Sequence, residues 1–262
     1  MDTRHPIDTR LPAMLRSGQP LRGIFNGLPS AAIVEMCAYA GFDFIVIDNE
    51  HGSADFETTE NMLRAARASG IVPVVRCFQA DIARVLDMGA SAVQIPMVNT
   101  AQQAAELAQL VRYPAQGRRG SAFSSRAAGY GAFGGDAHTG RSNAGIALIV
   151  MVETPQGVEN AAAIAAVEGV DAVFVGPNDL SHAMGFGSNS AAPEVQAAIE
   201  RAVRAAAAAG KCAGVLALTP EAEQKYATWG ARFFASTTTG IFTRALKQAA
   251  QAGRDDEVLL KY

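Results

Sequence analysis

Short apolar runs alternate with amphipathic or alanine-rich stretches along nearly the whole chain. Runs such as Phe44–Ile47 contain no polar residue, which is typical of parallel strands buried on both faces. The expected strands begin near Arg22, Asp43, Val72, Ala92, Ile146, Val170, Cys212 and Arg232. The expected helices cover Ala31–Ala40, Glu57–Ser69, Ile82–Met88, Ala101–Val111, Val158–Ala166, Val195–Ala209, Pro220–Thr228 and Ile241–Gln251. Eight alternations of strand and helix predict an α/β fold of the (β/α)₈ barrel type.

A doubly wound open sheet is the competing architecture. It would favour a G-x-G-x-x-G turn after the first strand, whereas Gly23–Gly27 reads G-I-F-N-G. No segment has the composition of a linker, so residues 1–262 are expected to form one barrel domain. The segments Tyr113–Gly145 and Ser181–Pro193 are longer than a simple repeat needs, and such loops are usually functional or disordered.

The composition excludes several classes of protein. With 262 residues, 49% of them apolar, the chain can bury one large core. No run approaches the roughly 18–20 apolar residues of a membrane helix, and the N-terminus lacks a signal-peptide pattern, so a cytoplasmic protein is expected. A net charge of −3 without a basic stripe argues against nucleic acid as a partner. Cys37, Cys77 and Cys212 lack the spacing of a zinc site and are expected to be buried thiols.

Two acids mark the ends of consecutive expected strands. Val150–Gly157 reads V-M-V-E-T-P-Q-G and Val173–Ser181 reads V-F-V-G-P-N-D-L-S, so Glu153 and Asp179 each follow a β-branched run. Neighbouring parallel strands lie about 5 Å apart, so both carboxylates could share one cation. Either acid could instead cap a helix. Oxygen ligands without Cys or His favour Mg²⁺ or Mn²⁺ over zinc.

Other polar side chains also follow strands, at the barrel end that carries active sites. His51 is the candidate general base, and Asp87 is the candidate carboxylate that orients it. Arg76 can grip a carboxylate or enolate oxygen, or form an ion pair with Asp48 or Glu50. The backbone amides at 178 and 179 are candidates for binding a substrate carboxylate. The remaining histidines, His5, His138 and His182, are expected on the surface or in loops.

The lysines restrict the possible aldol chemistry. A Schiff-base enzyme needs a lysine at the C-terminal end of a strand. Lys211 precedes the seventh strand, and Lys225, Lys247 and Lys261 lie on expected helices or the tail. The sequence therefore favours metal-dependent enolisation over Schiff-base catalysis.

At this point the motifs resemble those of the HpcH/HpaI class II pyruvate aldolases. The resemblance runs from about Gly23 to Leu246, and its motifs follow in the family's order: D-N-E-H-G, P-V-V-R, I-P-M-V, R-Y-P-x-x-G-x-R-G, V-E-T-P-Q-G-V-E-N and V-F-V-G-P-N-D-L-S. It implies a barrel of the phosphoenolpyruvate/pyruvate-binding type and reversible cleavage of a 4-hydroxy-2-oxo acid to pyruvate and an aldehyde. The acid would be 4-hydroxy-2-oxoheptanedioate or a 2-keto-3-deoxy sugar acid.

The resemblance also implies roles for single residues. Glu153 and Asp179 would hold Mg²⁺ or Mn²⁺, with Co²⁺ as a further option, and pyruvate would bind to that metal. His51 paired with Asp87 would be the acid/base, and Arg76 would steady the enolate oxygen. The resemblance implies that the amides of Asn178 and Asp179 bind the pyruvate carboxylate. It also implies that Leu216 faces the aldehyde and that Phe25 helps to wall the pocket. The segment 131–143 matches no family pattern and could shape aldehyde selectivity. The resemblance also implies a homohexamer. It would be a trimer of dimers in which the last helix packs on a neighbouring subunit.

Three alternatives remain open from the sequence. The same metal–enolate site could decarboxylate oxaloacetate. It could also cleave a CoA thioester, although no basic cluster for the CoA phosphates stands out. A non-catalytic barrel would be expected to lack a ligand or base, and none is missing from the motifs.

Overall fold

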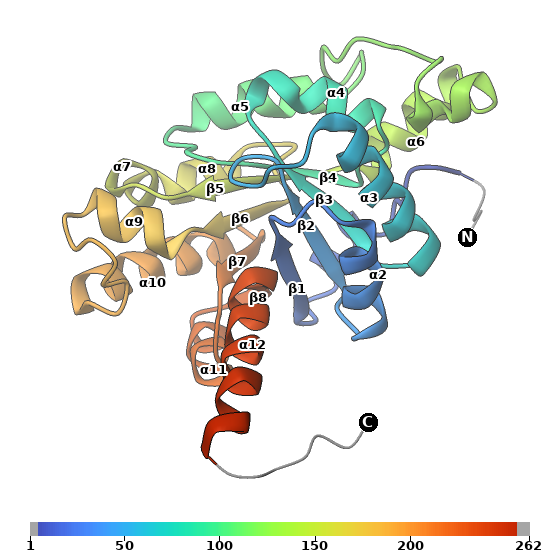
Figure 1. The fold of residues 1–262 in the computed structure, drawn as a ribbon. Coiled ribbons are helices and arrows are strands. Elements are labelled where there is room, and N and C mark those ends of the chain that lie inside the picture. The colour runs from blue at the N-terminus through green and yellow to red at the C-terminus, as the bar shows by residue number, and fades with distance from the viewer. Residues whose placement is uncertain (1–4, 256–262) are drawn as a thin grey trace.

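The computed structural model, which describes residues 5–255, contains a closed barrel of eight parallel strands paired in the order β1 to β8. Figure 1 shows the strands at the centre with helices around them. The strands are β1 Leu21–Asn26, β2 Phe44–Asp48, β3 Val72–Arg76, β4 Ala92–Ile95, β5 Ala147–Val152, β6 Ala172–Val175, β7 Cys212–Leu216 and β8 Ala231–Thr237. The predicted (β/α)₈ architecture is confirmed, and every strand begins within about two residues of its expected position.

Helices connect consecutive strands on the outside of the barrel, one further helix precedes the first strand, and another follows the last. They are α1 Leu11–Arg16, α2 Ala31–Tyr39, α3 Phe56–Ser69, α4 Ile82–Asp87, α5 Ala101–Val111, α6 Asp136–Gly145, α7 Pro155–Glu159, α8 Ala161–Ala166, α9 Pro177–Ala183, α10 Pro193–Ala208, α11 Pro220–Thr228 and α12 Thr238–Asp255, with short 3₁₀ turns at Gln79–Asp81 and Arg126–Gly131. The sequence pattern did not predict α1 or α6, because these short helices lack a clear apolar period, whereas a helix beginning near Asp179 was expected and corresponds to α9. Helix α1 places Leu11 and Leu15 against the barrel interior.

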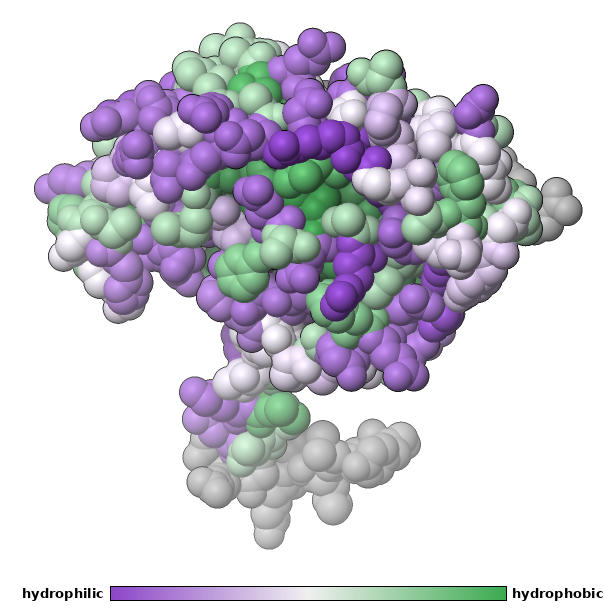
Figure 2. Space-filling model, turned by 90° about the horizontal axis from the view of Figure 1, so that it is seen from above, coloured by the Kyte–Doolittle hydropathy of each residue, from purple (hydrophilic) through white to green (hydrophobic). Residues whose placement is uncertain are grey.

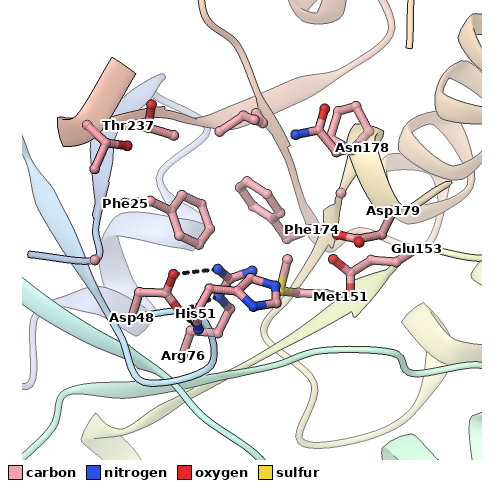
Figure 3. A pocket seen from close by; sticks show the side chains of 15 residues that line it. Phe25, Asp48, His51, Arg76, Met151, Glu153, Phe174, Asn178, Asp179 and Thr237 are labelled. Atoms are coloured by element: carbon pink, nitrogen blue, oxygen red, sulfur yellow. Dashed lines mark hydrogen bonds and ion pairs between the residues drawn. The ribbon is translucent and has the colours of Figure 1, made fainter. Parts of the chain in front are cut away.

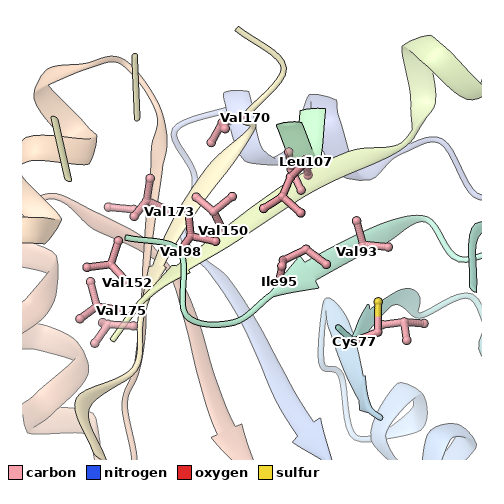
Figure 4. Packing of buried hydrophobic residues seen from close by; sticks show 14 of the residues in the cluster. Cys77, Val93, Ile95, Val98, Leu107, Val150, Val152, Val170, Val173 and Val175 are labelled. Carbon is pink, nitrogen blue, oxygen red and sulfur yellow. The ribbon is translucent and has the colours of Figure 1, made fainter. Parts of the chain in front are cut away.

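Alternate residues of each strand pack into two separate apolar clusters. The interior cluster contains Phe44 and Val46 of β2, together with Val72 and Val74 of β3. The intervening residues pack outward against the helices, and Figure 4 shows this outer layer around β4, β5 and β6. Continuing the alternation places Asp48 and Arg76 inside, at the C-terminal ends of their strands. The alternation of side chains along each strand thus places these polar residues at the C-terminal mouth of the barrel.

The long segment before β5 is ordered and lies away from that mouth. Helix α6 leads into the N-terminal end of β5, and its His138 is 1% exposed. The His138 ring lies near those of His5 and Tyr113, with centroids 6.2 and 5.9 Å away. Because His138 is buried in a helix, the expectation of a surface or loop position is wrong for this residue. His5 is also buried but lies in a loop, which the expectation allowed. His182 is exposed, as expected.

Helix α12 projects from the barrel toward the bottom of Figure 1. Most of its described side chains are exposed, including Leu246 at 69%. Within the described residues, no helix has the length and apolar character required to span a bilayer.

Candidate active site

A pocket of about 300 Å³ opens at the C-terminal ends of the strands. Figure 3 shows side chains from several strands converging on it. Its lining comprises Phe25, Gly27, Asp48, His51, Arg76, Met151, Glu153, Phe174, Gly176, Pro177, Asn178, Asp179, Leu216, Thr237 and Thr239. Every residue that the sequence nominated for the site lies here except Asp87. Space-filling shows apolar surface within a hollow ringed by hydrophilic residues when the molecule is viewed from above (Figure 2).

Arg76 forms a buried ion pair with two acids of the D-N-E-H-G motif. Its Nε and Nη2 donate to the two carboxylate oxygens of Asp48 at 2.8 and 2.6 Å, and its Nη1 lies 3.1 Å from Glu50. Burial alone would raise the pKa of Asp48, but the Arg76 ion pair and two backbone amides outweigh it and lower that pKa. Burial also raises the pKa of Glu50, against the attraction of Arg76. The ion pair weighed from sequence therefore forms, and it fixes the guanidinium in the pocket.

His51 follows β2 and faces the pocket with most of its side chain exposed. Its Nε2 lies 3.9 Å from Glu50, while its backbone amide donates to Asp48. The same carboxylate that holds Arg76 therefore also holds the turn that carries His51. This arrangement leaves the imidazole accessible to a molecule in the pocket.

Asp87 lies elsewhere in this chain. It is the last residue of α4, which returns the chain from the C-terminal end of β3 to the N-terminal start of β4. Its carboxylate accepts a hydrogen bond from Nη2 of the buried Arg119 at 2.6 Å. The expectation that Asp87 pairs with His51 is therefore wrong within this chain, because the strand-to-helix repeat puts the two residues at opposite ends of the barrel. The segment 131–143 contributes no residue to the pocket lining either.

Glu153 lies deep in the pocket wall, 2% exposed, directly after β5. One oxygen, Oε2, accepts the backbone amide of Met97 at 2.9 Å. The other, Oε1, faces Gly176, where a Cβ atom would come within 2.4 Å of it. Burial raises the pKa of Glu153 to about 7, and the charges of Asp179 and Glu50 add to this effect. A cation beside Glu153 would relieve both the burial of its charge and the repulsion from its neighbours.

Asp179 and Asn178 lie in the first turn of α9, on an exposed rim. Pro177 begins this helix and fixes the turn that follows β6. Figure 3 shows the carboxylates of Asp179 and Glu153 next to each other at one side of the pocket. The strand-end acids inferred from the sequence are thus brought together.

The donor set suits a hard divalent cation. Glu153 and Asp179 offer only oxygens, and no group of three or more His, Cys, Asp or Glu side chains with metal-binding geometry occurs in residues 5–255. A cation held by two carboxylates keeps open coordination positions, as catalytic sites for Mg²⁺-like ions do. A side chain at position 176 would collide with the Glu153 carboxylate, so the glycine there leaves room for this proposed ligand. The residues present therefore fit the cation.

Aromatic and aliphatic side chains form the opposite wall. The guanidinium carbon of Arg76 lies 4.9 Å from the centre of the Phe25 ring, and Phe25 meets Phe174 edge to face at 5.6 Å. Leu216 and Thr237 extend this wall along β7 and β8. Phe174 and Thr237 were not nominated from sequence, although strand alternation from Ala172 would have pointed Phe174 inward.

A (β/α)₈ barrel with a carboxylate pair, a fixed guanidinium and an accessible histidine at its C-terminal mouth defines a barrel enzyme suited to divalent-metal chemistry. The chain belongs to the HpcH/HpaI aldolase/citrate lyase family, whose model matches residues 22–245. Membership of this family implies a divalent-metal cofactor.

Named relatives agree with this assignment. The chain is 43% identical over 244 residues to a hydroxypyruvate/pyruvate aldolase of Delftia acidovorans, covering 92% of this chain and 89% of the relative. It is 38% identical over 237 residues to a 2-keto-3-deoxy-L-rhamnonate aldolase of Salmonella gallinarum, covering 88% of each. A crystal structure of a family member from Burkholderia cenocepacia superposes with a TM-score of 0.89 at 34% identity, covering 94% of this chain and all of that one. Aldolases are carbon–carbon lyases, and the chain is an enzyme of that class.

Proposed function

We propose that this enzyme catalyses the reversible aldol cleavage of a 4-hydroxy-2-oxo acid to pyruvate and an aldehyde. The observation that supports this most directly is the convergence of His51, Arg76, Glu153 and Asp179 from four strand ends on one pocket. A base, a fixed cation and a two-carboxylate metal site are the groups that cleavage next to a keto acid requires. One barrel supplies all of them, which supports the expectation of a single domain.

Glu153 and Asp179 would hold the metal ion, with Mg²⁺ or Mn²⁺ as the proposed cation and Co²⁺ as a further option. When bound, the cation withdraws electron density from the keto group and stabilises the negative charge that develops there. The name of the Delftia acidovorans relative, hydroxypyruvate/pyruvate aldolase, supports the choice of keto acid.

The side chains of the chain would move the proton and hold the charge. His51 accepts the proton of the C4 hydroxyl, the C3–C4 bond breaks, and its electron pair passes to the keto oxygen as the aldehyde leaves. Three of the five N–H groups of Arg76 face Asp48 and Glu50. The other two N–H groups remain to donate hydrogen bonds to the negatively charged keto oxygen. Return of the proton to C3 completes pyruvate. The first-turn amides at Asn178 and Asp179 are proposed to bind the pyruvate carboxylate.

The apolar wall would receive the aldehyde. Phe25 of β1 and Leu216 of β7 line the pocket, and Figure 3 shows Phe25 on the side opposite Glu153. Phe25 also packs on Arg76, so the aldehyde and keto-acid halves of the substrate would meet beside the guanidinium. The wall thereby excludes water from the bond that breaks.

Pyruvate release from 4-hydroxy-2-oxoheptanedioate and from a 2-keto-3-deoxy sugar acid, coupled to lactate dehydrogenase, tests the proposal. Release is expected to stop with EDTA, to return with Mg²⁺ or Mn²⁺, and to be lost in Glu153→Ala. Glu159→Ala, an exposed acid on the following helix, is the matched control. Turnover by Glu153→Ala after exhaustive chelation would refute the metal role. Metal-dependent loss of oxaloacetate or malyl-CoA alone would shift the assignment to decarboxylation or thioester cleavage.

The exposed apolar residues of α12 and α2 support the proposed homohexamer. Leu246 on α12 is 69% exposed, and Met36 and Tyr39 on α2 are 58% and 77% exposed. Helix α12 projects from the barrel in Figure 1 and leaves little of its surface against its own chain. Packing of this helix on a neighbouring subunit would bury these side chains. Light scattering after gel filtration should give the mass of six chains, and Leu246→Arg should reduce it.

A further inference from the structure

Asn99 connects the loop after β4 to the loop after β5. Its side-chain amide donates to the carbonyl of Met97 at 3.1 Å and accepts the hydroxyl hydrogen of Thr154. Its backbone carbonyl accepts from the side chain of Asn160 at 2.8 Å, and its backbone amide donates to Gln103 at 2.7 Å. Every hydrogen-bonding group of Asn99 thus has a partner. Two of these partners are close to Glu153: Met97 donates its amide to the Glu153 carboxylate, and Thr154 follows Glu153 in the sequence.

Met97 has a backbone conformation that residues with a side chain rarely adopt. Its φ is +59°. Its side chain is 48% exposed, so packing of the side chain does not explain this conformation. The conformation points the Met97 amide at Oε2 of Glu153, 2.9 Å away. The bond from Asn99 to the Met97 carbonyl holds the following peptide. The next residue, Val98, donates its own amide to Met151 of β5 at 3.0 Å, which fixes the loop on its other side.

We propose that Asn99 is a positioning residue that sets the orientation of the Glu153 carboxylate for the divalent cation. It reaches Glu153 by two routes: through Met97, whose amide binds one carboxylate oxygen, and through Thr154, the next residue along the chain. Asn99 does not line the pocket, so it acts through these neighbours and not on the substrate. The inference rests on the proposed metal role of Glu153, and it concerns how the site is held before any substrate arrives.

Mn²⁺ binding to the chelator-stripped full-length protein, followed by the EPR signal of free Mn²⁺, tests this without turnover. Asn99→Ala should raise the Mn²⁺ dissociation constant by about ten- to one-hundredfold, the usual cost of losing a residue that orients a metal ligand. Asn143→Ala is the matched control. That asparagine also joins two segments by two hydrogen bonds, both to the backbone of Tyr113, far from the pocket. It should lower the Tm without changing Mn²⁺ affinity.

Two substitutions at Met97 keep the inference testable if Asn99→Ala folds poorly. Met97→Gly retains the amide and accepts a positive φ, so Mn²⁺ affinity should stay within about twofold of wild type. Met97→Ile places a β-branched residue in the same conformation and should weaken binding by about tenfold. Wild-type protein that binds no Mn²⁺ would overturn the metal site and this inference together. Wild-type affinity in both Asn99→Ala and Met97→Ile would overturn the inference alone.

Discussion

Arg76 and Asp48 are direct partners in the ladder between β3 and β2, and their side chains meet in a bidentate ion pair inside the barrel. Both are less than a tenth exposed. The pair fixes the one pocket-lining guanidinium among the described residues, and Asp48 also receives the amides of Glu50 and His51. One carboxylate therefore organises the cation and the turn that carries the candidate base.

Replacing Asp48 by alanine should destabilise the protein by about 3 kcal/mol, because it leaves the buried guanidinium with Glu50 as its remaining ion-pair partner among the described residues. Urea denaturation measures the loss. Asp43→Ala is the control. Asp43 immediately precedes the same strand, and its carboxylate accepts the exposed backbone amide of Arg22, so its loss should cost much less. Equal losses in the two variants would contradict the importance of the ion pair.

The buried carboxyl of Glu153 should make the metal-free protein less stable as pH rises. Its folded pKa is raised to about 7 by burial and by the nearby Asp179 and Glu50, from an ordinary value of 4.5. The folded state therefore retains a proton that the unfolded state releases, so the stabilising contribution is complete below about pH 4.5 and is lost as pH rises through 7. Relative to Glu153→Gln, wild type should lose on the order of 3 kcal/mol across that window.

Urea midpoints of wild type and Glu153→Gln in EDTA, taken from pH 5 to pH 8, measure this difference. Adding Mn²⁺ at pH 8 should restore stability to wild type and leave the Gln variant unchanged, because the ionised carboxylate is the form that binds a cation. Parallel stability profiles for the two proteins would argue against a raised pKa.

Gly176→Ala should impair catalysis while the fold survives. The backbone of Gly176 has φ −94°, which alanine adopts readily, but its Cβ would meet Oε1 of Glu153 at 2.4 Å. A forced shift of about 1 Å at a catalytic carboxylate can lower kcat/KM by about a hundredfold. Gly140→Ala, on an exposed glycine of α6 with open space around its Cβ and no positive φ, tests the general effect of adding a methyl group. Wild-type kcat/KM in Gly176→Ala would show that the carboxylate has room to move.

Asp87→Ala should lower stability by about 3 kcal/mol, because it removes the acid partner of the buried Arg119. The Arg119 guanidinium also stacks on the Tyr113 ring at 4.5 Å and donates to Ser142, so its segment is expected to loosen. Thermal unfolding measures the change. Asp136→Ala, an exposed acid in the first turn of α6, should have little effect. An unchanged Tm in Asp87→Ala would remove the structural role assigned to this ion pair.

Much of the site follows from local sequence because parallel strands in a barrel end at one mouth. Glu153, Asp179, Arg76 and His51 each follow an apolar run, and the structure brings all four to the pocket. Thr237 was missed since β8 ends in a run of threonines, a residue type that gives no distinctive chemical signal.

The errors for Asp87 and for His138, which was expected on the surface or in a loop, share a cause. An aspartate suits a catalytic role and a histidine suits an exposed one, but the actual surroundings of these residues are formed by segments distant in sequence. Asp87 meets Arg119, and His138 meets Tyr113 and His5. No periodic pattern encodes such contacts, which arise where the long segment before β5 packs against α4 and α1.

The sequence by itself determined the barrel, the strand order and the acids at the strand ends. Hydrophobic periodicity is a local property, and a right-handed strand–helix repeat leaves few ways to close. Only the tertiary structure decided which polar groups share partners: Asp48 with Arg76, Met97 with Glu153, and Asn99 with Thr154. These contacts join residues from different strands or loops, and their geometry depends on how far each loop reaches and which way each peptide turns.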